Sequence, residues 1–186
     1  MSKSKDYPLV SVILSVYNDE SNVLDAVNSI LKQTYKNLEL LIMNDGSIDD
    51  TSKVLNQIND ERVKIFNNKK NIGLTKSLNK LIYLSNGNFI ARQDSDDISE
   101  ENRILKQYEF LLKKDLDACT ARAKIKNTST SIPGISFYLP TKLTIRYKNP
   151  FIHGTLFIRK STLLMVGNYD ETYYYSQDYT LIFYNN

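Results

Sequence analysis

The chain has 186 residues, of which 41% are apolar, so it can bury the core of one domain. Its formal net charge is only +3 and its basic residues are scattered, which argues against a nucleic-acid-binding protein. A single cysteine, Cys119, excludes an intramolecular disulfide and a CxxC metal site. No apolar run reaches the ~20 residues that a membrane span requires.

Strands and helices are predicted to alternate along the first two thirds of the chain. Residues 9–16 (LVSVILSV) form a nearly continuous apolar run, which is typical of a strand covered on both faces. Apolar side chains then recur at helical spacing from Val23 to Leu31, before a second strand at 38–43 (LELLIM). The next predicted elements are a weak helix at 50–58, a strand at 62–66, a helix between Gly73 and Gly87, a strand at 88–91 and a helix at 100–114.

From about residue 116 the regular alternation fades. Residues 124–137 (KIKNTSTSIPGISF) are polar and rich in turn residues, which indicates a loop. Residues 151–160 predict a strand, and residues 161–166 a short helix. Alternating strands and helices indicate an α/β fold with a mostly parallel sheet flanked by helices. We expect one domain with an irregular C-terminal third, in three parts: a tail at 1–7, an α/β half at 8–115 and a less regular portion at 116–186.

Three of the predicted strands end in polar clusters. These clusters are Tyr17-Asn18, the segment 44–47 (NDGS) and the segment 94–97 (DSDD). In an open α/β sheet, ligands bind at the carboxyl ends of the strands. The sheet would therefore bring the three clusters to one edge, although each of them is also ordinary turn chemistry.

Asp94 and Asp96 are the strongest candidates for metal ligands. In an extended segment they point to the same side, and two like carboxylates so close together favour a cation between them. Hard oxygen ligands suit Mg²⁺ or Mn²⁺, which keep open positions for substrate phosphates. A solvated turn before the next helix explains the same residues equally well. The chain has no Walker-type or G-x-G-x-x-G loop, so a Gly-rich phosphate site is not indicated.

Taken together, these segments resemble the family 2 glycosyltransferases, bacterial enzymes of the GT-A (Rossmann-like) fold that use nucleotide-diphosphate sugars. The matching segments occur in the family's order across residues 8–182. They are PLVSVILSVYND, SILKQTYKNLELLIMNDGSIDDT, NIGLTKSLN, GNFIARQDSDD, FIHGTLFIRK and GNYDE followed by QDYTL. Each fragment is unspecific by itself, whereas the combination is specific.

The resemblance implies nucleotide-binding roles for five residues. Ser15 and Tyr17 would line the nucleobase pocket, with Tyr17 as a stacking surface. Asp45 would accept a hydrogen bond from the base, which favours uracil because its N3–H is a donor. Asp94 would contact the ribose or metal-bound water. Lys76, in GLTKSLN, would face the nucleotide phosphates, with an exposed helix lysine as the simpler alternative.

The resemblance also implies a metal cofactor and a catalytic base. Mn²⁺ or Mg²⁺ would bind at the DSD segment, which matches the family's DxD motif, with Asp96 as the direct ligand and Asp94 as its support. His153, the only histidine, is a further candidate ligand, against a purely structural role. Asp178, in QDY, matches the base that takes the proton from the acceptor hydroxyl. Gln177 stands where the family usually has an acid.

The implied function is the transfer of a sugar, with inversion, from a nucleotide-diphosphate sugar to a hydroxyl of a glycan or lipid-linked acceptor. A UDP-sugar is the favoured donor, and a non-catalytic module that binds a nucleotide sugar is the alternative. The family usually continues well beyond the catalytic base, whereas this chain ends eight residues after Asp178, so we expect a truncated acceptor portion.

Because no signal-like segment follows Met1, we expect a cytoplasmic protein, with peripheral association at the inner face of the membrane left open. The sequence leaves the oligomeric state undetermined.

Overall fold

The computed structural model describes residues 7–134, 138, 144 and 151–172. Strands and helices alternate in its first part, in the order β1 (Val10–Val16), α1 (Val23–Leu31), β2 (Leu38–Asn44), α2 (Thr51–Leu55), β3 (Val63–Asn67), α3 (Leu74–Leu84), β4 (Phe89–Asp94) and α4 (Arg103–Lys114). The later elements are β5 (Ala118–Cys119), β6 (Ala123–Lys124), β7 (Ser131–Ile132), the 3₁₀ helix η2 (His153–Thr155), β8 (Phe157–Arg159) and α6 (Lys160–Met165).

The central sheet is mostly parallel, as the alternating sequence pattern predicts. Its strand order is β3-β2-β1-β4-β8-β5. β1 lies in the middle of the four parallel strands, because it pairs with β2 on one side and with β4 on the other. β8 pairs antiparallel with both β4 and β5. The chain order reverses between β2 and β4 on either side of β1, and such a reversal creates a crevice at the carboxyl edge of the sheet.

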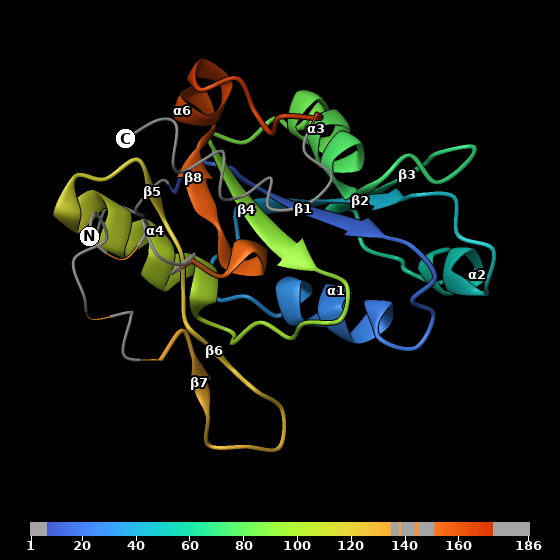
Figure 1. The fold of residues 1–186 in the computed structure, drawn as a ribbon, viewed down its shortest axis with the longest axis horizontal. Helices are drawn as coiled ribbons and strands as arrows, with labels where there is room; N and C mark the ends of the chain where they lie inside the picture. The colour runs from blue at the N-terminus through green and yellow to red at the C-terminus, as the bar shows by residue number, and fades with distance from the viewer. Residues whose placement is uncertain (1–6, 135–137, 139–143, 145–150, 173–186) are drawn as a thin grey trace, which may run out of the picture.

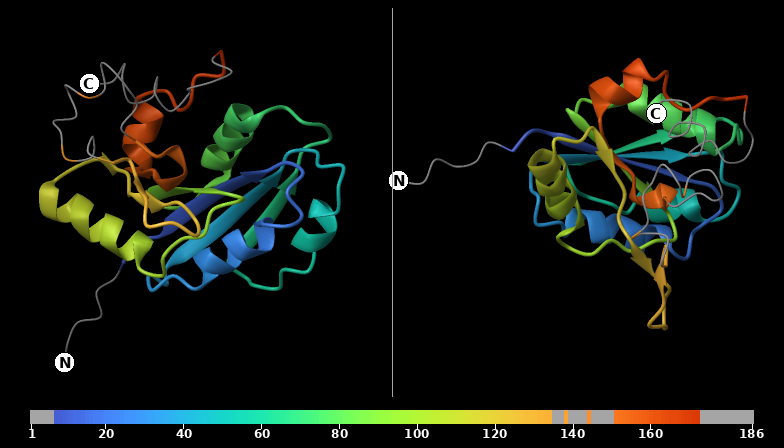
Figure 2. Two further views of the ribbon diagram at one scale, coloured as in Figure 1. Left: turned by 60° about the horizontal axis from the view of Figure 1, so that its bottom comes forward. Right: turned by 60° about the vertical axis from the view of Figure 1, so that its left-hand side comes forward.

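Helices cover both faces of the sheet (Figures 1 and 2). The side chains of Val12 and Leu14 belong to a core layer that also contains buried residues of α1, α2 and α4. Ile13 faces the opposite way, into a layer with buried residues of α3 and α6. Side chains of a strand alternate between its two faces, so an apolar run such as that of β1 requires helices on both sides.

The C-terminal part departs from the predicted elements in two places. Residues 151–160 do not form one strand: η2 occupies His153–Thr155, and the strand β8 is confined to Phe157–Arg159. The predicted loop at 124–137 contains part of a small hairpin, since β6 and β7 pair antiparallel and project from the body in Figure 1.

The helix predicted at 100–114 begins later, at Arg103, whose side chain is buried. Within the described part of the chain, no helix has the length and apolar character to cross a membrane.

Candidate functional site

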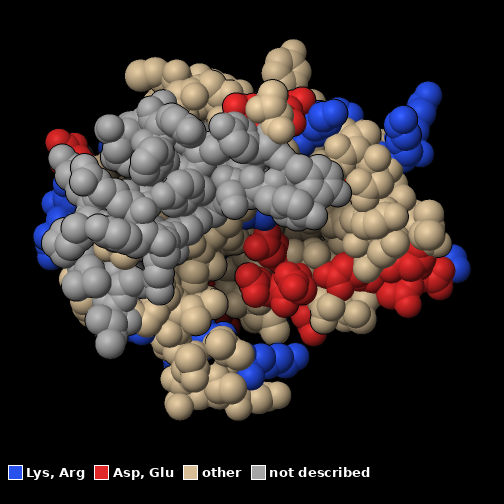
Figure 3. All heavy atoms as spheres, in the orientation of Figure 1, with Lys and Arg blue, Asp and Glu red and all other residues tan. Residues whose placement is uncertain are grey.

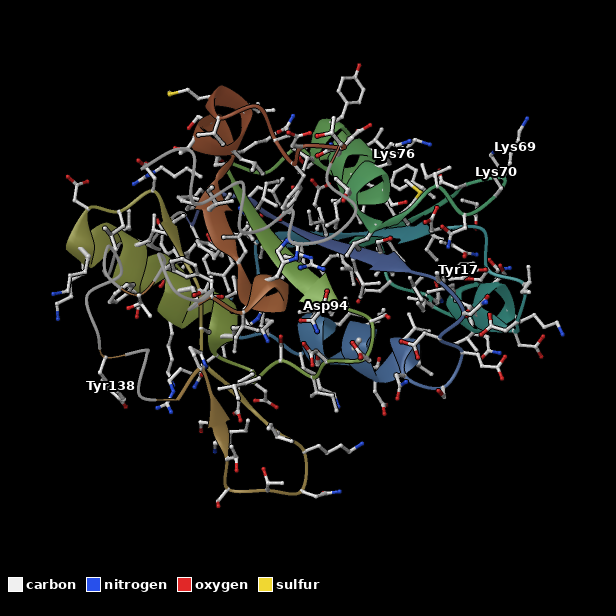
Figure 4. The ribbon with its side chains drawn as sticks, viewed as in Figure 1. Tyr17, Lys69, Lys70, Lys76, Asp94 and Tyr138 are labelled. Atoms are coloured by element: carbon white, nitrogen blue, oxygen red, sulfur yellow. The ribbon has the colours of Figure 1, made fainter. Side chains whose placement is uncertain are left out.

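Ser15, Asp45 and Asp94 come together at the carboxyl edge of the sheet. Ser15 of β1 is in register with Met43 of β2 on one side and with Asp94 of β4 on the other. Ile13 and Met43 precede Ser15 and Asp45 by two positions, and both belong to the core layer of α3. Because the strand period is two, Ser15 faces the same side of the sheet as α3. Figure 4 shows Asp94 at the end of β4 and Tyr17 beyond the end of β1, where the Tyr17 side chain is 46% exposed.

Asp45 is buried and holds the loop between β3 and α3. Its Oδ1 accepts hydrogen bonds from Asn68 Nδ2 at 2.8 Å and from the backbone N–H of Ile72 at 3.0 Å. Its Oδ2 accepts one from the backbone N–H of Gly73 at 2.9 Å. The next residue, Gly46, has φ +73, and a Cβ there would lie 2.5 Å from the loop's backbone. Only glycine allows this approach, so the DG pair serves loop packing as well as turn formation.

Arg92 and Gly154 hold the Asp94 carboxylate from two sides. Arg92 is 3% exposed, and its Nη2 lies 2.7 Å from Asp94 Oδ1. A Cβ at Gly154, in η2, would lie only 2.5 Å from Asp94 Oδ2. The glycine therefore lets η2 pack directly against the end of β4. A charge-assisted pair with a buried guanidinium fixes the position of the partly exposed carboxylate.

The turn after β4 concentrates negative charge. Desolvation raises the pKa of Asp97, and the neighbouring carboxylates of Asp94 and Asp96 raise it further. Arg103 and Arg92 act in the opposite direction. Burial lowers the pKa of Arg103 to about 10, so this guanidinium keeps its charge at neutral pH, and its Nη1 donates to the backbone oxygen of Arg92 at 3.0 Å. The neighbouring carboxylates of Asp94, Asp96 and Asp97 favour the binding of a cation at the exposed side of the turn.

Asp19 joins this turn to the loop between β1 and α1. Its Oδ2 accepts a hydrogen bond of 2.6 Å from Ser95 Oγ, and its backbone N–H donates to Thr51 Oγ1 at 2.9 Å. The loops that follow β1, β2 and β4 are thus linked directly. Figure 3 shows the resulting band of acidic side chains along this edge of the molecule.

His153 lies beside the acidic turn in a largely buried position. Its ring makes an edge-on contact with Tyr169, with centroids 5.3 Å apart. Burial lowers the pKa of His153 to about 2, and the charge of Arg92 lowers it in the same direction. The imidazole is therefore neutral at physiological pH. Its buried Nε2 has no hydrogen-bond partner among the described residues. A neutral imidazole nitrogen is the form that ligates metal ions.

Lys76 lies away from the acidic turn. Figure 4 shows Lys76 on α3, and its side chain lines a shallow depression of about 490 Å³ together with Asn79, Tyr83 and Glu171. None of these residues lines the groove beside Asp96. The predicted base, Asp178, and its neighbour Gln177 lie outside the described residues.

The carboxylates fit a divalent ion that keeps positions open for a ligand. Among the residues that the structure describes, no group of three or more His, Cys, Asp and Glu side chains is arranged to hold a metal ion. Asp94 and Asp96 would therefore supply only part of a coordination shell. Mg²⁺ bound to nucleotides commonly has one or two protein carboxylates, with substrate phosphates and water completing the octahedron.

Two residues of this edge were not predicted as site residues from the sequence. Asp19 directly follows the Tyr17-Asn18 cluster, which is the signal that could have found it, and its contact with Ser95 bridges 76 positions of sequence. Gly154 follows the only histidine, but no turn pattern marks it, because its requirement for a missing Cβ arises from Asp94 on another strand.

Solved structures with the same fold include proteins in complex with nucleotides. The chain superposes on Staphylococcus aureus TarS (residues 1–349) in complex with UDP with a TM-score of 0.78 and 22% identity, covering 92% of this chain and 53% of that one. It also superposes on the mannosyltransferase PcManGT of Pyrobaculum calidifontis in complex with GDP-Man and Mn²⁺, with a TM-score of 0.70 and 18% identity, covering 88% and 48% of the two chains. The fold is therefore the Rossmann-like GT-A fold, in a single domain.

Sequence similarity defines the family. The family model described as Glycosyl transferase family 2 matches residues 11–167. An uncharacterised glycosyltransferase of Haemophilus influenzae is 34% identical over 92% of this chain and 58% of its own length. The Escherichia coli UDP-Glc:α-D-GlcNAc-diphosphoundecaprenol β-1,3-glucosyltransferase WfgD is 37% identical over 75% of this chain and 54% of its own. The chain thus belongs to the family 2 glycosyltransferases, and it spans little more than half the length of these relatives.

Proposed function

We propose that this protein binds a nucleotide-diphosphate sugar, preferably a UDP-sugar, at the carboxyl edge of the sheet. It would transfer the sugar, with inversion, to a hydroxyl of a glycan or lipid-linked acceptor. The observation that carries the proposal is the convergence of Ser15, Asp45 and Asp94 at one edge in a family 2 chain. We assign donor binding to residues 8–115, and the acceptor side and the catalytic base to residues 116–186.

The nucleoside would bind between the ends of β1 and β2. The half-exposed Tyr17 ring offers a flat surface on which a base can stack. Ser15 lies two residues earlier, near the end of β1 and opposite Asp94 of β4. Asp45 Oδ2 accepts one hydrogen bond, from Gly73, so a lone pair remains for the N3–H of uracil. We assign Asp94 to the ribose or to metal-bound water. Lys76, on α3, would reach the phosphates only if its long side chain turned toward the edge.

The diphosphate would bind with Mn²⁺ or Mg²⁺ at the acidic turn. Asp96 and Asp94 would hold the ion. His153, whose buried Nε2 has no partner among the described residues, would join them as a third ligand only if its ring moved toward the turn. When bound, the ion offsets the charge that develops on the departing diphosphate. The protein's own contribution is to hold Asp94 in place through Arg92 and Gly154.

We assign the chemical step to Asp178. Its carboxylate would accept the proton of the acceptor hydroxyl while that oxygen forms a bond to the anomeric carbon. The bond from the anomeric carbon to the diphosphate oxygen breaks at the same time, on the opposite face. One displacement of this kind inverts the anomeric configuration. Gln177, its neighbour in the sequence, stands where the family usually has an acid.

The acceptor is proposed to be a lipid-linked glycan. The name of the relative WfgD gives a diphosphoundecaprenol-linked sugar as that enzyme's acceptor. An acceptor of this class would bring the protein to the inner face of the membrane from the cytoplasm. A non-catalytic nucleotide-sugar-binding module remains the alternative.

Calorimetry with UDP and Mn²⁺ tests the donor site. We expect binding that EDTA abolishes and that Asp96→Asn weakens by at least 10-fold, whereas Glu109→Gln, a neutralising change on the exposed side of α4, has no effect. Absence of Mn²⁺-dependent binding to any nucleotide sugar would overturn the proposal. Asp178→Asn separates the two alternatives, because it should leave UDP binding intact and abolish transfer to a lipid-linked acceptor. A module without activity shows no transfer in either form.

A further inference from the structure

A groove of about 850 Å³ lies between the turn after β4 and the β6–β7 hairpin. One end of the groove is formed by Asp96, Asp97 and Gly154, beside the proposed metal site. The other wall is formed by residues 121–126 together with Ser131 and Ile132. A molecule in this groove would therefore reach the acidic turn, where the diphosphate of the donor is proposed to bind.

The hairpin side of the groove is basic. Lys124 and Lys126 line it from the hairpin, and Lys106 lines it from α4. All three lysines are exposed, and none forms a salt bridge with another described residue. Figure 3 shows basic side chains gathered on the hairpin, directly below the acidic band. The carboxylates that also line the groove, Asp25, Asp96, Asp97 and Glu100, belong to α1 and to the segment between β4 and α4, so the hairpin side itself has a positive potential that attracts an anionic group.

Apolar side chains share this groove with the lysines. Ile98, Ile125 and Ile132 all line it, and they are 66%, 46% and 41% exposed. Exposed isoleucines in a groove indicate a ligand with hydrocarbon surface, because covering them removes apolar area from water. A nucleotide sugar has no such surface, and a free glycan has neither the hydrocarbon nor the negative charge.

We propose that the groove binds the acceptor through the diphosphate and the adjoining hydrocarbon of a lipid carrier. Lys106, Lys124 and Lys126 bind the diphosphate, and the three isoleucines contact the first part of the hydrocarbon chain. The sugar attached to this diphosphate then extends toward Asp96. This inference rests on the proposed function, which supplies the reaction that the acceptor undergoes. The binding of the acceptor to the groove can nevertheless be measured without any turnover.

Farnesyl diphosphate is a suitable probe, because it carries the diphosphate and the hydrocarbon without a sugar. Its binding to the 186-residue chain is measured by calorimetry in EDTA, since the proposed donor site holds a diphosphate through a divalent ion, whereas the lysines of the groove need none. We expect the triple change Lys106→Ala, Lys124→Ala and Lys126→Ala to weaken binding at least 10-fold. The double change Lys113→Ala and Lys114→Ala, at the opposite end of α4, serves as the matched control and should leave it unchanged.

Three further binding measurements, with farnesol, inorganic pyrophosphate and lipid vesicles, decide which ligand the groove recognises. Farnesol and inorganic pyrophosphate should each bind at least 10-fold more weakly than farnesyl diphosphate, and equal binding of either would overturn the proposal. Equal binding of farnesyl diphosphate to the triple variant and the original chain would also overturn it. If the triple change instead abolished binding to phosphatidylglycerol vesicles and spared farnesyl diphosphate, the groove would be a membrane contact and not an acceptor site.

A parallel titration with UDP and Mn²⁺ separates this inference from the proposed function. The triple variant should bind UDP as the original chain does, because none of the three lysines lies at the ends of β1 or β2. If the original chain fails to bind UDP, the proposed function is wrong. If it binds UDP but not farnesyl diphosphate, only the assignment of the groove is wrong.

Discussion

The Ser95 hydroxyl donates a hydrogen bond of 2.6 Å to the Asp19 carboxylate. This contact ties the acidic turn after β4 to the loop after β1. Asp19 is itself held by the first residue of α2, since its backbone N–H donates to Thr51 Oγ1, and the adjacent Asn18 N–H donates to Ser47 Oγ in the loop after β2. The residue between the two candidate metal ligands thus connects the three loops that form the proposed donor site.

Ser95→Ala removes this connection without changing the charge of the turn. The lost hydrogen bond should cost about 1 kcal/mol, which corresponds to roughly a 5-fold weaker binding of UDP with Mn²⁺ if the loops must be held together for binding. Ser161→Ala, on the exposed side of α6, is the control and should bind UDP normally. Unchanged binding in the Ser95 variant would show that the contact does not position the site.

Gly154→Ala tests whether η2 must pack against Asp94. The added Cβ would lie 2.5 Å from Asp94 Oδ2, so either the carboxylate or η2 has to move. We expect Mn²⁺-dependent UDP binding to weaken about 10-fold, a change of about 1.4 kcal/mol. Gly134→Ala is a matched control, because a Cβ at Gly134 meets no atom within 4 Å. Equal affinities of the two variants would contradict the proposed role of this contact.

His153 should make the protein sensitive to mild acid. Its pKa is about 2 in the folded chain and near 6.5 when unfolded, so below pH 6.5 only the unfolded chain gains the proton. Stability is therefore complete above about pH 6.5 and falls as the pH decreases, by about 2 kcal/mol at pH 5. His153→Gln should remove this part of the pH dependence, as urea unfolding at pH 7, 6 and 5 would measure. Because the chain has no other histidine, parallel curves for the two proteins would refute the assignment.

Glu39 is a buried carboxylate that we expect to stabilise the fold. Burial would raise its pKa, but hydrogen bonds from Lys64, Ser11 and Asn86 lower it to about 2. Its contribution is therefore present above the unfolded pKa of about 4.5 and is lost as the pH falls toward 2.

Glu39→Gln should lower the free energy of unfolding at pH 7 by about 2–3 kcal/mol, because Lys64 loses its charged partner and one of the donors loses its acceptor. Urea denaturation measures the change, with the exposed Glu61→Gln as control. A difference below 0.5 kcal/mol, within the range of ordinary surface substitutions, would show that the network contributes little.

The regular part of the fold follows closely from local sequence patterns. The predicted strand at 9–16 is β1 to within one residue, and the predicted strand at 38–43 is β2 to within one residue. Both are apolar runs whose period and composition are local properties. The strand predicted at 151–160 is confirmed only over Phe157–Arg159, because η2 occupies His153–Thr155, where Gly154 packs against Asp94.

By itself, the sequence determined the alternation of strands and helices and the placement of three polar clusters at strand ends. Once parallel pairing is assumed, those clusters must share an edge, because parallel strands end on the same side of a sheet. Only the tertiary structure decided how the clusters are held: Asp45 by the loop before α3, Asp94 by Arg92 and η2, and Ser95 by Asp19. Apart from the pair of Arg92 and Asp94, these contacts join residues far apart in the chain, so no local pattern records them. The same holds for the groove, whose lysines and isoleucines meet only because the hairpin folds back beside the acidic turn.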